Sequence, residues 1–235
     1  MIPEKSIIRV LSADAPKAGL RKNAEAFSRE TGIAHEIELL TGPKIKERVL
    51  SGTTDADLIV IPRPQFDDLA AAGFLDPNDI AVIGHVTVGV TVRNGAREPD
   101  LSSVDGFRKS VLAADRLIYN TASSGQYIHE MFERLGMAEA VSRKATILGT
   151  GKAAMEALAA DTTGTAIGFG HVTEIRLHDS LGTHLVGPLP GEIGRQTPYA
   201  GGALSKAPNL EMARRFLAFL VSPGGRKTFS ETGVL

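Results

Sequence analysis

One local order recurs along the chain: a short apolar run, a turn of small residues, then a segment with helical periodicity. The short runs favour β-strands because they are apolar, partly β-branched and bounded by turn residues; they are Ile7–Leu11, Ala34–Leu40 and Asp57–Ile61. Apolar residues then recur at helical spacing over Pro16–Thr31, Lys44–Leu50 and Phe66–Ala72. Strands that alternate with helices build parallel sheets, so the order predicts an α/β fold with an open, mainly parallel sheet.

The second half of the chain repeats this order. Arg116–Tyr119 and Thr165–Phe169 predict strands, and Gln126–Leu135 and Lys152–Ala160 predict helices. Two further apolar runs, Val86–Val92 and Tyr199–Leu204, are interpreted as strands that cross between two lobes. The 235 residues suffice for two compact lobes.

We therefore expect two Rossmann-like lobes with a ligand cleft between them. Residues 1–84 plus 200–235 would form lobe one, and residues 85–199 would form lobe two. The amphipathic segment Leu210–Leu220, followed by a short helix from Gly225, should cover lobe one.

Composition and short motifs argue against several classes of function. Twenty-six basic residues face 27 acidic ones, so the basic surface of a nucleic-acid binder is not expected. The chain has no cysteine, and no His-x-x-x-His or carboxylate cluster occurs, so neither a metal site nor a cofactor is predicted. The Gly149-Thr150-Gly151 fragment lacks the third glycine of a dinucleotide fingerprint and follows no strongly predicted strand.

Three strand-end turns are candidates for anion binding. They consist of small residues that precede predicted helices: Ser12–Ala15, Thr41–Pro43 and Thr121–Gly125. The first amides of a helix have no intrahelical partner and carry a positive partial charge, so such turns admit an anion close to backbone donors. The alternative is that each Ser or Thr only caps its own helix.

These turns also carry a resemblance to a known family. Ser12-Ala13-Asp14-Ala15, Thr41-Gly42-Pro43-Lys44 and the segment Thr121–Tyr127, with the C-terminal segment Ala213–Pro223, resemble the molybdate-binding-protein branch of the type II periplasmic binding proteins. The likeness runs from Ile7 to Leu235. It implies a two-lobed binding protein that closes on its ligand by hinge motion and delivers it to an ABC-type permease.

The resemblance also implies ligand positions. The family's first serine falls on Ala15, or on Ser12 if the loop is shifted, and its second falls on Thr41 or Gly42. In lobe two the backbone donors fall on Ser124 and Gly151, and the family's tyrosine falls on Phe169. With their neighbours and the charged residues discussed next, the expected ligand-binding set is Ser12, Ala13, Ala15, Thr41, Gly42, Lys44, Arg63, Ser123, Ser124, Gly125, Gly151, Phe169 and His171.

Charged side chains at predicted strand and helix ends favour an organic ligand. Arg63 follows the third strand, Lys44 opens the second helix, and His171 follows the strand that ends near Phe169. Open α/β sheets bind ligands at the carboxyl ends of their strands, and a guanidinium pairs with a carboxylate through two parallel hydrogen bonds. We therefore expect a di- or tricarboxylate rather than a metal oxyanion, although an oxyanion stays an alternative. Tyr119 and Tyr127 could donate hydroxyls to the ligand or belong to the core.

Two functions remain open at this point. The first is a solute-binding protein, which we expect to be a monomer without a membrane-inserted segment. It would be periplasmic if a signal peptide has been removed and cytoplasmic otherwise, because the N-terminal segment contains no secretory apolar region. The second is an enzyme, since some relatives of this branch are aconitate isomerases; His171 or Asp14 would then transfer the proton.

Overall fold

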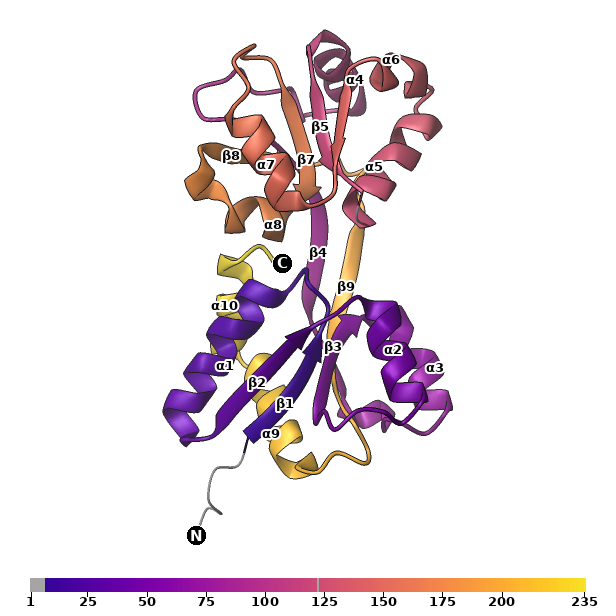
Figure 1. Cartoon of the computed structure of the whole chain (residues 1–235), viewed down its shortest axis with the longest axis vertical. Coiled ribbons are helices and arrows are strands. Elements are labelled where there is room, and N and C mark those ends of the chain that lie inside the picture. The colour runs from indigo at the N-terminus through magenta and orange to yellow at the C-terminus, as the bar shows by residue number, and fades with distance from the viewer. Residues whose placement is uncertain (1–6, 122) are drawn as a thin grey trace. The chain divides into compact units, whose positions relative to one another are not determined.

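The computed structural model describes residues 7–121 and 123–235 and divides into two compact units. The first unit contains the described residues up to Val86 together with Thr197–Leu235, and the second contains Thr87–Gln196. These boundaries differ by two or three residues from the expected ones. Figure 1 labels the elements of both units.

The first unit is built on a mixed sheet in the order β2-β1-β3-β9. The strands β1 (Ile7–Ser12), β2 (Ala34–Leu39) and β3 (Leu58–Pro62) are parallel, as their alternation with helices predicts. The last strand, β9 (Gln196–Ala203), pairs antiparallel with β3.

Helices cover both faces of this sheet (Figure 1). On one face α1 (Lys17–Thr31), α9 (Leu210–Leu220) and α10 (Pro223–Glu231) pack on Ile8 and Val10. On the other face α2 (Gly42–Leu50) and α3 (Phe66–Ala71) pack on Leu11 and Ile59. Successive strand residues point to opposite faces, so the continuous apolar runs of the sequence fill two cores.

The second unit has a mixed sheet as well. Its strands are β4 (Ile80–Arg93), β5 (Leu117–Asn120), β6 (Ala145–Leu148), β7 (Ile167–His171) and β8 (Thr183–Pro188). The order β4-β7-β5-β6 has β5 parallel to both neighbours, while β7 and β8 pair antiparallel with β4.

The second sheet also separates two cores. The first contains residues of α4 (Val104–Ala113), α5 (Ser123–Arg134) and α6 (Ala138–Ser142), and the second contains residues of α7 (Gly151–Ala159) and α8 (Val172–Leu177). Short 3-10 turns complete the chain; they are Arg63–Gln65, Pro77–Asp79 and Asp179–Leu181. No helix among the described residues is both long and apolar enough to cross a membrane.

The sequence patterns missed several elements of the second unit, namely α4, α6, β6 and α8. β6 has only four residues, and none of them is buried, so it lacks the apolar run that marks a strand. Because β6 precedes it directly, the Gly149-Thr150-Gly151 fragment does follow a strand, which corrects the expectation. The crossing strand β4 is also longer than predicted and begins at Ile80.

Candidate functional site

The strand-end turns of the first unit meet along one edge of its sheet. The Leu40 amide donates to the Ser12 carbonyl at 3.0 Å, and the Ala13 amide donates to the Val60 carbonyl at 2.8 Å. These bonds tie the end of β1 to the ends of both neighbouring strands. Parallel strands end at the same edge, so the turns after β1, β2 and β3 are neighbours there.

The first turn uses its polar side chains internally. The hydroxyl of Ser12 is fully buried and donates to the Ala13 carbonyl at 2.8 Å, so that proton is not directed at a ligand. Ala13 is buried and Ala15 packs against the α1 core, which leaves both alanines only backbone groups to offer. Asp14 is exposed and forms an ion pair with Lys17 at 2.8 Å.

The second turn is the more open donor site. Thr41 is the N-cap residue of α2, yet its hydroxyl makes no capping hydrogen bond, so the capping alternative does not hold here. Gly42 is buried beneath the side chain of Gln65, and a Cβ added at Gly42 would lie 2.7 Å from Gln65 Oε1. That oxygen is itself buried and has no hydrogen-bond partner among the residues that the structure describes, and no sequence pattern indicated it.

Two cations lie on the segments that end at this edge. Arg63 follows β3 directly and donates from Nη1 to Asp67 Oδ1 at 2.6 Å. Its side chain is 37% exposed, and the pair with Asp67 is a solvent-facing i,i+4 contact of small energetic value. Lys44, in the first turn of α2, is exposed and has no ion-pair partner among residues 7–121 and 123–235.

The turn after β5 forms the corresponding edge of the second unit. Of the predicted turn Thr121–Gly125, Ala122 lies outside the described residues. Ser123 is exposed, whereas Ser124 is buried and its hydroxyl donates to Asn120 Oδ1 at 3.4 Å. Gly125 lies so close to the Asn120 carbonyl that an added Cβ would be 1.6 Å from the oxygen. Asn120, only 4% exposed, is therefore a residue of this edge that sequence analysis missed.

One of the first backbone amides of α7 already has a hydrogen-bond acceptor. The Thr150 hydroxyl accepts from the Ala153 amide at 3.1 Å, which is ordinary capping. Glu174 of α8 packs on Gly151, where an added Cβ would lie 2.5 Å from Cγ and 3.1 Å from Oε1. Glu174 Oε1 also lies 3.1 Å from His178 Nε2, so a carboxylate of the protein occupies the side of this helix start.

Phe169, one of the expected ligand positions, has no side chain to offer a ligand. Its ring is fully buried and meets the rings of Phe107 and Phe132 edge-on at 6.2 and 5.6 Å, so the side chain belongs to the core. His171, in contrast, is the last residue of β7 and is half-buried at the carboxyl edge.

Two tyrosines were candidates either for ligand binding or for the core, and both pack inside the second unit. Tyr119 is 2% exposed within the core beside α4 and α5, and this burial raises the pKa of its phenol. The Tyr127 hydroxyl donates to the Ile193 carbonyl at 2.7 Å.

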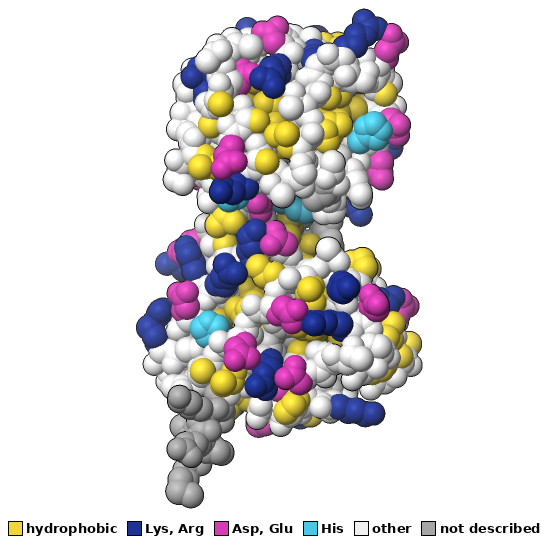
Figure 2. Space-filling model, in the orientation of Figure 1, with side chains coloured by type: hydrophobic (Ala, Val, Ile, Leu, Met, Phe, Trp, Pro, Cys, Tyr) yellow, Lys and Arg dark blue, Asp and Glu magenta, His cyan; other side chains and the backbone are white. Residues whose placement is uncertain are grey.

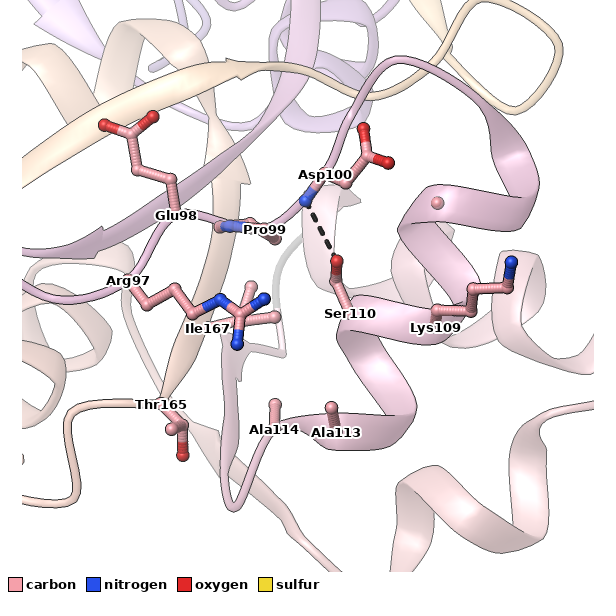
Figure 3. Close-up of a pocket in the computed structure, with 11 residues that line it drawn as sticks. Arg97, Glu98, Pro99, Asp100, Lys109, Ser110, Ala113, Ala114, Thr165 and Ile167 are labelled. Carbon is pink, nitrogen blue, oxygen red and sulfur yellow. Dashed lines mark hydrogen bonds between the residues drawn. The ribbon is translucent and has the colours of Figure 1, made fainter.

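A pocket of about 440 Å³ lies elsewhere in the second unit (Figure 3). The loop Arg97–Asp100 and helix α4 border it, and the Asp100 amide donates to Ser110 Oγ at 2.9 Å. Ile167, one of the lining residues, is the first residue of β7, and Ala114 precedes β5, so the pocket lies at the amino ends of these two strands. It is therefore distinct from the carboxyl edge that carries the strand-end turns.

The surface carries charges of both signs. On the face shown in Figure 2, Lys and Arg side chains are interspersed with Asp and Glu side chains in each unit. Among the described residues, no group of three or more His, Asp or Glu side chains could hold a metal ion.

Comparisons with known proteins agree with this architecture. An aconitate isomerase from Pseudomonas sp. is 26% identical over 233 residues, which cover 97% of this chain and 87% of that protein. A substrate-binding domain assigned to a molybdenum ABC transporter of Clostridium difficile superposes with a TM-score of 0.79 at 15% identity, over 97% of this chain and 98% of the other. The periplasmic molybdate-binding protein of Azotobacter vinelandii superposes with a TM-score of 0.71 at 15% identity and the same coverage.

The comparisons confirm the fold class and the resemblance that the strand-end turns indicated. The two α/β units with open mixed sheets have the type II periplasmic binding protein fold. The family model of the bacterial extracellular solute-binding proteins matches residues 8–235, and the chain therefore belongs to that family.

Proposed function

We propose that this protein binds a small organic carboxylate, and that the strand-end turns of the first unit hold it. One observation carries the proposal: the cations Lys44 and Arg63 lie on segments that end at the edge where the Thr41 hydroxyl and the start of α2 remain uncapped. Amides, a hydroxyl and two cations suit a ligand with several separate carboxylates. The relative named as an aconitate isomerase supports a tricarboxylate.

Other features argue against an inorganic oxyanion as the preferred ligand. The Ser12 hydroxyl donates to the Ala13 carbonyl, and Ala15 has no hydroxyl. In the second unit, Glu174 places negative charge beside Gly151, at a position where the resemblance expects an oxyanion donor.

Titration calorimetry with trans-aconitate, cis-aconitate, citrate, molybdate and sulfate tests the proposal. We expect saturable binding of a tricarboxylate, with weaker or no binding of the inorganic anions. Arg63→Ala and Lys44→Ala should each weaken that binding about tenfold or more, because each removes a charge-assisted contact of about 1.5–3 kcal/mol.

Arg48→Ala is the matched control for these variants. Arg48 lies farther along α2 than Lys44 and pairs with Glu38 at 2.6 Å, so its removal should leave the affinity unchanged. Absence of saturable binding for all carboxylates would contradict the proposed ligand class, and preferential binding of molybdate would restore the oxyanion alternative.

A second candidate function is isomerisation of such a tricarboxylate. The Pseudomonas relative favours it, because its name describes an enzyme and the match spans nearly the whole chain. A base would remove a proton from a carbon next to a carboxylate and return it to another carbon as the double bond shifts. Asp14 and His171 are the candidates for this transfer, and Arg63 and Lys44 would stabilise the developing negative charge.

Incubation with cis-aconitate, followed by chromatography of the two isomers, tests this second function. If the protein is an isomerase, replacing the transferring residue, by Asp14→Asn or His171→Ala, should slow interconversion about 10²- to 10⁴-fold. His129→Ala is the control, because His129 is exposed and pairs with Glu133 of its own helix at 3.4 Å. Binding without turnover by the unmodified protein would leave passive solute binding as the function.

For the binding function, we further propose a periplasmic location and an ABC-type permease as the receiving partner. Membership in the extracellular solute-binding family supports both. We also propose that the protein is a monomer.

A further inference from the structure

A tyrosine that none of the expected ligand positions includes lies at the edge of the first unit. Tyr199 is on β9, and its register partner on β3 is Pro62, the last residue of that strand. Because β9 runs antiparallel to β3, Tyr199 lies at the carboxyl end of β3, beside the turn that carries Arg63.

The environment of Tyr199 is well defined. The residue is only 7% exposed and belongs to the core that α1, α9 and α10 form with β1. Nevertheless, its hydroxyl makes no hydrogen bond with any residue that the structure describes. The hydroxyl oxygen is not one of the fully buried polar atoms without a partner, so the ring lies in the core while the hydroxyl reaches the surface, where a ligand can contact it.

Asp14 places this hydroxyl near the first strand-end turn. Burial, together with the smaller effect of the negative charge of Asp14, raises the pKa of Tyr199 to about 12. At neutral pH the phenol is therefore protonated and can donate a hydrogen bond. Asp14 itself pairs with Lys17 at 2.8 Å, and this pairing offsets the charge that would otherwise repel an approaching anion.

We propose that the Tyr199 hydroxyl is a ligand-binding group of the first unit, which donates a hydrogen bond to a carboxylate oxygen of the bound organic anion. The proposal rests on the proposed carboxylate-binding function. It adds a side-chain donor from β9 to the backbone donors and cations on the segments that follow β1, β2 and β3. This donor would be the main hydroxyl contribution besides Thr41, since the Ser12 hydroxyl donates to the Ala13 carbonyl.

The test is Tyr199→Phe, with trans-aconitate and citrate as calorimetric probes. Phenylalanine keeps the ring in the core and removes only the hydroxyl, so the ligand-free protein should unfold at the same temperature or slightly higher. We expect the affinity for the bound probe to fall about 10- to 100-fold, as for other hydrogen bonds to a charged acceptor. Tyr119→Phe is the matched control, because it removes a buried phenol hydroxyl from the second unit's core and should leave the affinity unchanged.

A second measurement keeps the test decisive if the variant folds poorly. The chain has three tyrosines, so ring-labelled tyrosine gives three signals in an NMR spectrum, which Tyr119→Phe and Tyr127→Phe assign by elimination. Addition of the probe should shift the Tyr199 signal and leave that of Tyr119 in place. Equal affinity of Tyr199→Phe and the unmodified protein, or an unshifted Tyr199 signal at saturation, would overturn the role of Tyr199 alone. No binding by the unmodified protein would overturn the carboxylate function and this inference together.

Discussion

Replacing Gly125 with alanine will destabilise the second unit by about 3 kcal/mol or more, at the upper end of what overpacking usually costs. The added Cβ would lie 1.6 Å from the Asn120 carbonyl oxygen and 2.6 Å from its carbon. Both atoms belong to the backbone of β5, so no side-chain rotation can relieve the overlap. The start of α5 must move away from the strand, and a urea unfolding curve will show a lower midpoint.

Gly149→Ala provides the control for this prediction. Gly149 lies in the turn after β6, the strand next to β5, and a Cβ added there meets no atom within 4 Å. Its substitution should change stability by no more than about 0.5 kcal/mol, as for other surface changes. If Gly125→Ala proved as stable as Gly149→Ala, the close approach of α5 to β5 would be incorrect.

Removing the carboxylate of Asp57 will destabilise the first unit by about 3–5 kcal/mol, because Asp57→Ala leaves two backbone donors without acceptors. Asp57 is fully buried at the residue before β3. Its Oδ2 accepts from the Arg9 amide and its Oδ1 accepts from the Asn209 amide, both at 2.9 Å. The carboxylate therefore ties β1 to the segment that leads into α9.

Two further variants separate this effect from a general loss of charge. Asp57→Asn keeps one acceptor oxygen and nearly the same volume, so chemical denaturation should give an intermediate loss. Asp55→Ala removes a carboxylate that is 76% exposed and lies 3.4 Å from Arg9, and it should cost less than about 1 kcal/mol. A similar loss for Asp55→Ala and Asp57→Ala would contradict the role assigned to the buried hydrogen bonds.

The two stability predictions also bear on the proposed site. Gly125 and Asn120 set the position of the Ser123–Ser124 turn in the second unit, and Asp57 precedes the strand that leads to Arg63 in the first. Since Asp57 lies at the opposite end of β3 from Arg63, an affinity loss there would be secondary to the loss of stability.

Local sequence patterns determined the fold class and most elements of this protein. The helix Leu210–Leu220 has the bounds that its apolar periodicity predicted, and the first strand was predicted within one residue. Such patterns succeed because burial on one face of a helix or on both faces of a strand repeats over a few residues. The patterns failed where burial is weak, as in β6. They also failed where a polar side chain of a turn forms a hydrogen bond within that turn, as the Ser12 hydroxyl does with the Ala13 carbonyl.

Only the tertiary structure decided which groups of the candidate site meet. Tyr199 lies near Asp14, Gln65 covers Gly42, and Glu174 covers Gly151, although each pair is separated by many residues. Phe169 was expected at the ligand, whereas its ring lies in an aromatic core with Phe107 and Phe132. The physical reason is that strand pairing and helix packing fix side-chain neighbours across the sheet, while the periodicity of one segment reports only which of its own faces is buried.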